Sequence, residues 1–134
     1  MSWTEHFRLI VRHNVINLPN LVSLRVDESL YFANASYLED YIYQLIAENE
    51  GLEHVILQCP AVNEIDLSAL EALESIDHRL REQGLTLNLS EVKGPVMDAL
   101  IKSDFLDHLS GKVYLTHHQA VKDLKTDEIE PYII

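Results

Sequence analysis

Val55-Ile56-Leu57 is followed, after Cys59-Pro60, by Val62-Asn63-Glu64-Ile65-Asp66-Leu67-Ser68-Ala69-Leu70, and the hydrophobic pattern changes within this stretch. The short continuous apolar run at its start is typical of a strand that is buried on both faces. From Asp66 onward, the apolar residues recur with the spacing of a helix that has one buried side. The stretch therefore predicts a central strand that leads directly into a helix.

The same alternation of strand and helix patterns extends in both directions along the chain. Apolar or alternating runs predict four further strands, over Leu21–Val26, Tyr31–Phe32, Leu85–Leu89 and Val113–Leu115. Helical spacing predicts four helices, over Ala35–Asn49, Leu67–Gln83, Pro95–Lys102 and His117–Leu124. Strands that alternate with helices indicate an α/β fold, in which helices cover a mostly parallel or mixed sheet.

The apolar sides of these elements define the expected core. It comprises Leu38, Ile42, Ile56, Leu70, Leu73, Leu87 and Leu100. In the helix that starts near Asp66, an apolar stripe should face inward, while Glu71, Glu74, Asp77 and Arg81 should face water. The single cysteine, Cys59, ends an apolar run, so we expect a buried side chain rather than a reactive thiol.

The composition limits the classes of partner. The 134 residues suit one domain, and 22 acidic against 10 basic residues give a formal net charge of −12. Such a surface repels phosphate backbones and anionic headgroups, so we expect no nucleic acid and no direct lipid binding. No run approaches the ~18 apolar residues of a membrane helix, so we expect this part of the chain to be soluble.

The sequence contains no signature of an enzyme. The four glycines stand far apart, which excludes a glycine-rich phosphate loop. The seven histidines lack metal-ligand spacing, and the neighbours His117 and His118 would point ~100° apart on a helix. No serine or cysteine has the local signature of a nucleophile. We therefore expect no catalysis, no metal and no cofactor.

The helix start at Asp66 is the one place of chemical interest. Asp66 is placed as the N-cap, and Ser68 lies in the first turn, where backbone N–H groups and the helix dipole favour an anion. In one interpretation, which the chemistry alone favours, Asp66 caps the helix and Ser68 is an ordinary polar residue. In the other, Ser68 is a phosphorylation or ligand-contact position, although Glu64, Asp66 and Glu71 would repel a phosphate.

At this junction the chain resembles the STAS domain, the module shared by sulfate transporters and anti-sigma factor antagonists. Asp66-Leu67-Ser68-Ala69-Leu70 is similar to the family's Asp-Ser-Ser-Gly-Leu junction, with Leu67 and Ala69 as departures. Three further segments resemble the STAS region of bacterial sulfate permeases of the SulP family: Thr4–Arg8, Leu24–Ala35 and Glu91–Val96. The resemblance covers nearly the whole chain.

The resemblance implies a four- or five-stranded mixed sheet with helices mainly on one side. It also implies a regulatory domain at the cytoplasmic face of the inner membrane, attached to the membrane portion of a transporter of sulfate or a related anion. A cytoplasmic partner protein and a homodimer are further partners that it leaves open. The alternative is a free-standing anti-sigma factor antagonist switched by phosphorylation of Ser68, which the departures at Leu67 and Ala69 disfavour.

The two ends of the chain differ from the part between them. Residues 1–14 have little periodicity, so we expect them to form a lead-in from the membrane portion. Residues 15–124 should form the STAS domain itself. Residues 125–134 should form a C-terminal tail, which is acidic and then ends in apolar residues.

Overall fold

The computed structural model describes residues 11–14 and 18–125, and within them five strands form one sheet in the order β1-β2-β3-β4-β5. The bounds are Val11–His13 (β1), Leu21–Val26 (β2), His54–Gln58 (β3), Thr86–Ser90 (β4) and Val113–Tyr114 (β5). Strand β1 pairs antiparallel with β2, and the other neighbouring strands pair parallel. The sheet is therefore mixed, as the sequence predicts.

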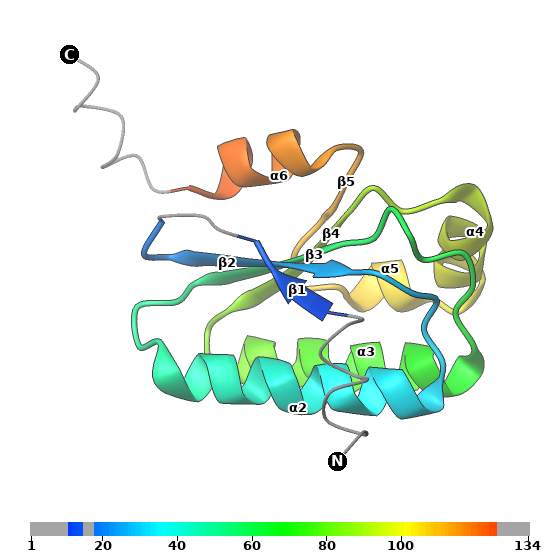
Figure 1. Ribbon diagram of the computed structural model, residues 1–134, viewed down its shortest axis with the longest axis horizontal. Helices are drawn as coiled ribbons and strands as arrows, with labels where there is room; N and C mark the ends of the chain where they lie inside the picture. The colour runs from blue at the N-terminus through cyan, green and yellow to red at the C-terminus, as the bar shows by residue number, and fades with distance from the viewer. Residues whose placement is uncertain (1–10, 15–17, 126–134) are drawn as a thin grey trace.

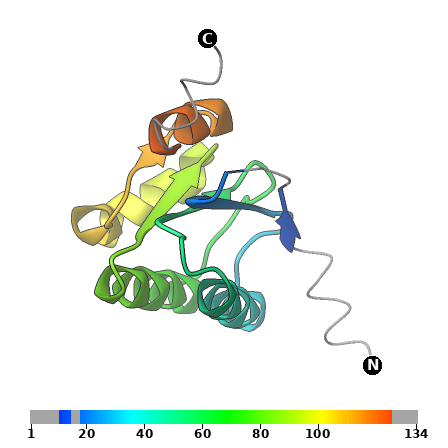
Figure 2. The same cartoon turned by 90° about the vertical axis from the view of Figure 1, so that its left-hand side faces the viewer.

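Helices cover both faces of this sheet (Figures 1 and 2). The long helices α2 (Phe32–Glu48) and α3 (Leu67–Glu82) lie side by side on one face, and α6 (His117–Leu124) lies on the other. The shorter α4 (Gly94–Lys102) and α5 (Phe105–His108) connect β4 to β5. The two longest helices share one face, which confirms the expectation of helices mainly on one side.

The main core lies between the sheet and the α2–α3 layer. All seven residues predicted for the core are buried: Leu38, Ile42, Ile56, Leu70, Leu73, Leu87 and Leu100. In β3, Val55 and Leu57 belong to this main cluster, whereas Ile56 belongs to a smaller cluster with Ala120 of α6. Strand β3 is therefore buried on both faces, because successive side chains of a strand point in opposite directions.

The strand predicted over Tyr31–Phe32 is wrong. Leu30 makes an isolated parallel bridge, and α2 begins directly afterwards at Phe32. Asn34 explains the early start of the helix, since its Oδ1 accepts from the Tyr31 N–H at 2.8 Å and its Nδ2 donates to the Ser29 carbonyl at 2.8 Å. The first bond pairs the backbone N–H of the N-cap Tyr31, and the second holds Asn34 to the preceding turn, so the helix begins at Phe32.

Strand β1 and helix α5 are elements that the sequence did not predict. Val11–His13 falls in the stretch assigned to the lead-in, yet Val11 pairs with Val26 and is 5% exposed. Three residues are too few to show a strand period. The rest of the predicted lead-in before residue 11, and the tail after residue 125, lie outside the described residues. The limits of the domain itself therefore stay a prediction.

Candidate functional site

Helix α3 begins beyond the carboxyl end of β3, at the junction that the sequence singles out. Asp66 is its N-cap, as predicted: the backbone is extended, and Oδ1 accepts from the Ala69 N–H at 2.8 Å. Leu67 and Ser68 form the start of the first turn, and both are exposed. Ser68 therefore lies where the amide end of a helix favours a negative charge.

The loop before α3 is bonded to the segment that leads into α2. Leu30 N donates to the Glu64 carbonyl at 2.9 Å, and Asp66 N donates to the Leu30 carbonyl at 3.2 Å. Ser29 Oγ accepts two more backbone N–H bonds from the same loop, each at 3.0 Å. These four bonds place the first turns of α2 and α3 beside each other, a contact that no local sequence pattern predicts.

Ser68 lies in a groove of about 210 Å³ between α2 and α3. The groove is lined by Phe32, Ser36, Glu39, Ser68, Glu71, Ala72 and Ser75. Two of these side chains are carboxylic acids and none is basic. Tyr43 Oη donates to Glu39 Oε2 at 2.7 Å. The pKa of Tyr43 is raised, mainly by burial and next by this hydrogen bond. A phosphate on Ser68 would therefore face two acidic side chains as well as the helix amides.

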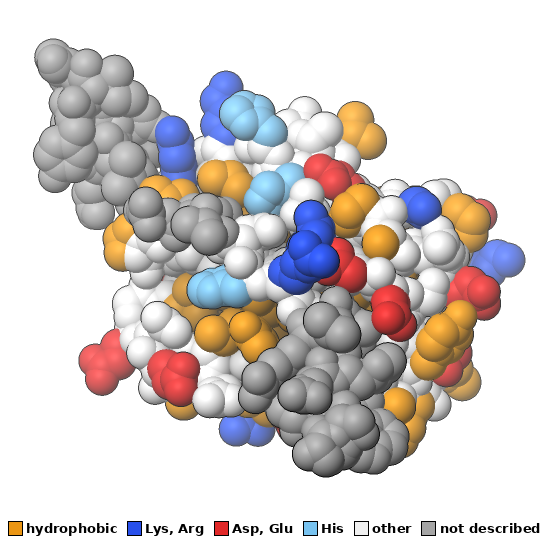
Figure 3. Space-filling model, in the orientation of Figure 1, with side chains coloured by type: hydrophobic (Ala, Val, Ile, Leu, Met, Phe, Trp, Pro, Cys, Tyr) orange, Lys and Arg blue, Asp and Glu red, His pale blue; other side chains and the backbone are white. Residues whose placement is uncertain are grey.

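Figure 3 shows one face of the molecular surface in the orientation of Figure 1. Hydrophobic and acidic side chains lie next to one another along the end where α2, α3 and α4 begin, on the right of the figure, and some Lys or Arg side chains also lie there. The two carboxylates that line the Ser68 groove, next to apolar side chains, suit a basic or apolar partner better than an anionic ligand.

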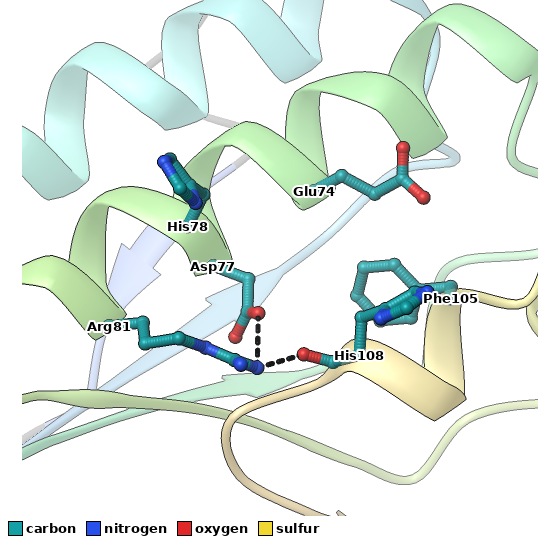
Figure 4. A pocket seen from close by; sticks show the side chains of 6 residues that line it. All are labelled: Glu74, Asp77, His78, Arg81, Phe105 and His108. Atoms are coloured by element: carbon teal, nitrogen blue, oxygen red, sulfur yellow. Dashed lines mark hydrogen bonds and ion pairs between the residues drawn. The ribbon is translucent and has the colours of Figure 1, made fainter.

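A second hollow, of about 310 Å³, lies between α3 and α5 (Figure 4). It is lined by Glu74, Asp77, His78, Arg81, Phe105 and His108. In Figure 4, Asp77 and the backbone carbonyl of His108 converge on the Arg81 guanidinium, which donates to both. The Arg81 guanidinium thus already pairs with groups of the fold itself.

Asp77 corrects a second expectation from the sequence. The helical period predicts that Asp77 faces water, but this residue is only 5% exposed. Its Oδ1 accepts from the Ser110 N–H at 3.0 Å and from Ser110 Oγ at 2.5 Å. The segment that leads into β5 thus covers this side of α3, which the period of the helix alone could not reveal.

Two further residue types with reactive side chains have structural roles. Cys59 is buried as predicted, and burial, with a smaller effect of Glu91, raises the pKa of its thiol to about 12. The thiol is therefore protonated at neutral pH and a poor nucleophile. His117 is half-buried, with Nε2 3.3 Å from Ser23 Oγ, whereas His118 is exposed.

The described part of the chain contains neither a cluster of metal-ligating side chains nor a helix that could span a membrane. Within residues 11–14 and 18–125, no group of three or more His, Cys, Asp or Glu side chains is arranged to hold a metal ion. Over the same residues, no helix combines the length and the apolar character required to cross a membrane.

The domain is of the α/β class. Its sheet is mixed and five-stranded, α2 and α3 cover one face, and a capped helix start follows β3. The family model described as STAS domain matches residues 12–120. The chain belongs to the STAS domain family. The resemblance seen at the Asp66–Leu70 junction is thereby confirmed.

The chain is similar in sequence to a sulfate transporter and similar in fold to proteins of two kinds. Sulfate transporter 3.1 of Arabidopsis thaliana is 35% identical over 116 residues, which are 78% of this chain and 18% of that protein. The chain thus spans less than a fifth of that relative. The STAS domain of a SulP transporter from Vibrio cholerae has a TM-score of 0.66, with 21% identity and 88% of each chain covered. The Bacillus cell fate determinant SpoIIAA, in its phosphorylated form, also has a TM-score of 0.66, with 13% identity, covering 86% of this chain and 99% of that one.

We expect Ser68→Asp to leave the free energy of unfolding almost unchanged. The helix dipole would favour the new carboxylate by ~0.3–1 kcal/mol, and repulsion from Glu39 and Glu71 would offset this gain. Ser75→Asp is the matched control, since Ser75 lines the same groove away from the helix start and gains nothing from the dipole. Urea titration of the three proteins measures the effect. A change above about 1 kcal/mol for Ser68→Asp would contradict this balance.

Proposed function

We propose that this chain is the cytoplasmic regulatory domain of a transmembrane transporter for sulfate or a related inorganic anion. The observation that carries this proposal is the 35% identity to a sulfate transporter over 78% of the chain. That relative is much longer than the matched region, so the domain's first partner would be the membrane portion of the same protein.

The charges of the domain support a regulatory role outside the path of the anion. The net charge of −12 repels a sulfate dianion. The groove at Ser68 adds Glu39 and Glu71 and has no basic residue among its lining side chains. We therefore propose that the domain is not an enzyme, binds no nucleic acid and binds sulfate weakly at best. It would act through its surfaces on the abundance, assembly or gating of the transporter.

The same reasoning gives the proposed location and the remaining partners. The domain would lie at the cytoplasmic face of the membrane that holds the transporter. A cytoplasmic protein and a second copy of the domain are further candidate partners. The shared fold with SpoIIAA keeps an antagonist switched by Ser68 as the alternative function. Recovery of stoichiometric phosphate on Ser68 from native cells would favour that alternative.

Deleting the domain from the full-length transporter should reduce anion uptake while leaving the order of preference among anions unchanged. This outcome is expected because an acidic regulatory domain influences assembly or gating but does not line the substrate path. The measurement is uptake of sulfate and competing anions by vesicles that hold equal amounts of intact and truncated protein. A changed order of preference would place the domain in the substrate path. An upstream reading frame without hydrophobic spans would remove the transporter assignment altogether.

A further inference from the structure

The starts of α2 and α3 expose a cluster of apolar side chains. Tyr31, Phe32 and Leu67 are 45%, 68% and 69% exposed. They are three of the five large hydrophobic residues that are exposed within the described part of the chain. The other two, Ile101 and Leu115, lie on α4 and between β5 and α6. Single exposed apolar side chains are ordinary, whereas a cluster with a polar rim marks an interaction site.

Backbone bonds hold this cluster in place before any partner binds. The bridge between Leu30 and Ile65 joins the two segments that lead into the helices. Asn34 caps α2 by accepting from the Tyr31 N–H at 2.8 Å, and Asp66 caps α3. An ordered surface loses less conformational entropy on binding than a mobile loop does. The apolar cluster is therefore suited to docking.

The charge beside the cluster selects the chemistry of the partner. Phe32 forms one wall of the groove that also contains Glu39 and Glu71, and none of its lining residues is basic. We call Tyr31, Phe32, Leu67, Glu39 and Glu71 together the α2–α3 surface. Anionic lipid headgroups would be repelled from it. Lysine and arginine fit it, because their apolar stems pack on rings while their charged ends reach carboxylates.

The α2–α3 surface follows the carboxyl end of β2, which is also the end at which β1 begins. Val11, the first residue of β1, pairs with Val26, the last residue of β2, and α2 follows that same end of β2. Ten residues precede Val11 in the sequence, and such a segment spans at most ~35 Å. Any part of the protein that precedes residue 1 is therefore attached within ~35 Å of Val11.

We propose that the α2–α3 surface docks on the cytoplasmic loops of the membrane portion of the same protein, through their lysine and arginine side chains. Cytoplasmic loops of membrane proteins carry an excess of these residues, which complements the acidic and apolar surface. This inference rests on the proposed function. It adds the face of the domain through which regulation would pass.

Photo-crosslinking in the full-length protein tests the proposed contact. Ser68→Cys places a maleimide-benzophenone label inside the groove, and Leu115→Cys places the same label on an exposed residue of another loop. Cys59 should not react, because it is buried and its thiol pKa is raised to about 12; other reactive cysteines would be replaced. The protein is held in nanodiscs of neutral phosphatidylcholine, and crosslinked peptides are identified by mass spectrometry.

We expect crosslinks from position 68 to loop peptides of the membrane portion, at a yield at least about tenfold above position 115. Adding Phe32→Glu and Leu67→Glu should lower that yield at least about tenfold, with thermal unfolding as the folding check. If the double variant fails to fold, the comparison of positions 68 and 115 decides alone. Equal yields at the two positions, or crosslinks to lipid or to another protein, would overturn the docking. In that case, loss of uptake on deleting the domain would still support the proposed function.

Discussion

Gly111→Ala is expected to lower the free energy of unfolding by about 2–4 kcal/mol, because it combines overpacking with the loss of buried hydrogen bonds. A Cβ at this position would overlap the Asn88 side chain and the Leu87 carbonyl oxygen. Asn88 cannot turn aside freely, since it is 1% exposed and bonded on both ends of its amide. Its Nδ2 donates to Thr86 Oγ1 at 2.9 Å, and its Oδ1 accepts from the Lys112 N–H at 2.9 Å.

Gly94→Ala is the matched control for this substitution. Gly94 is the first residue of α4, and a Cβ there would meet no atom within 4 Å. Alanine should therefore leave stability unchanged or raise it by up to about 1 kcal/mol, by restricting the unfolded chain. Chemical denaturation of both variants, analysed with a common slope, gives the two values. Equal stability of the Gly111 and Gly94 variants would show that β4 does not hold this segment as closely as the structure indicates.

Asp77→Ala should lower the free energy of unfolding by about 2–4 kcal/mol, because it leaves two half-buried donors of Ser110 without their acceptor. Asp77 Oδ1 accepts both the N–H and the hydroxyl of Ser110, at 3.0 Å and 2.5 Å. Ser110 Oγ in turn accepts from the Leu87 N–H at 3.0 Å, so the carboxylate supports a bond to the central sheet. Arg81 would also lose its side-chain partner, at 3.4 Å, but it is half exposed and should contribute less.

Two further variants distinguish the effect of losing the bonds to Ser110 from the effect of losing the charge of Asp77. Asp77→Asn keeps one acceptor oxygen, so it should recover part of the loss. Glu74→Ala removes an exposed carboxylate one turn earlier on α3, and its effect should stay within about 0.5 kcal/mol. Thermal and urea unfolding at neutral pH measure all three. If Asp77→Ala were as mild as Glu74→Ala, Asp77 would not be the acceptor that holds Ser110.

The candidate site could be predicted from the sequence only in part. Asp66 as N-cap and Ser68 in the first turn follow from residue type and position at a strand-to-helix junction. The facing carboxylate of Glu39 does not, because it comes from a helix about thirty residues earlier in the chain. The groove and its charge exist because the Leu30–Ile65 bridge joins the two helix starts. Its role in docking stays a proposal.

The sequence by itself determined the α/β class, the main helices, the buried strand β3 and the core residues, since hydrophobic period is a local property of each segment. The tertiary structure decided the features that depend on contacts between distant segments. Val11–His13 is a strand because β2 offers it an edge, and Phe32 begins a helix because Asn34 caps it. Asp77 is buried because Ser110 reaches it across the fold. Gly111 lies against β4, where no side chain fits. The residues next to a glycine in the sequence do not predict which strand will pack against it.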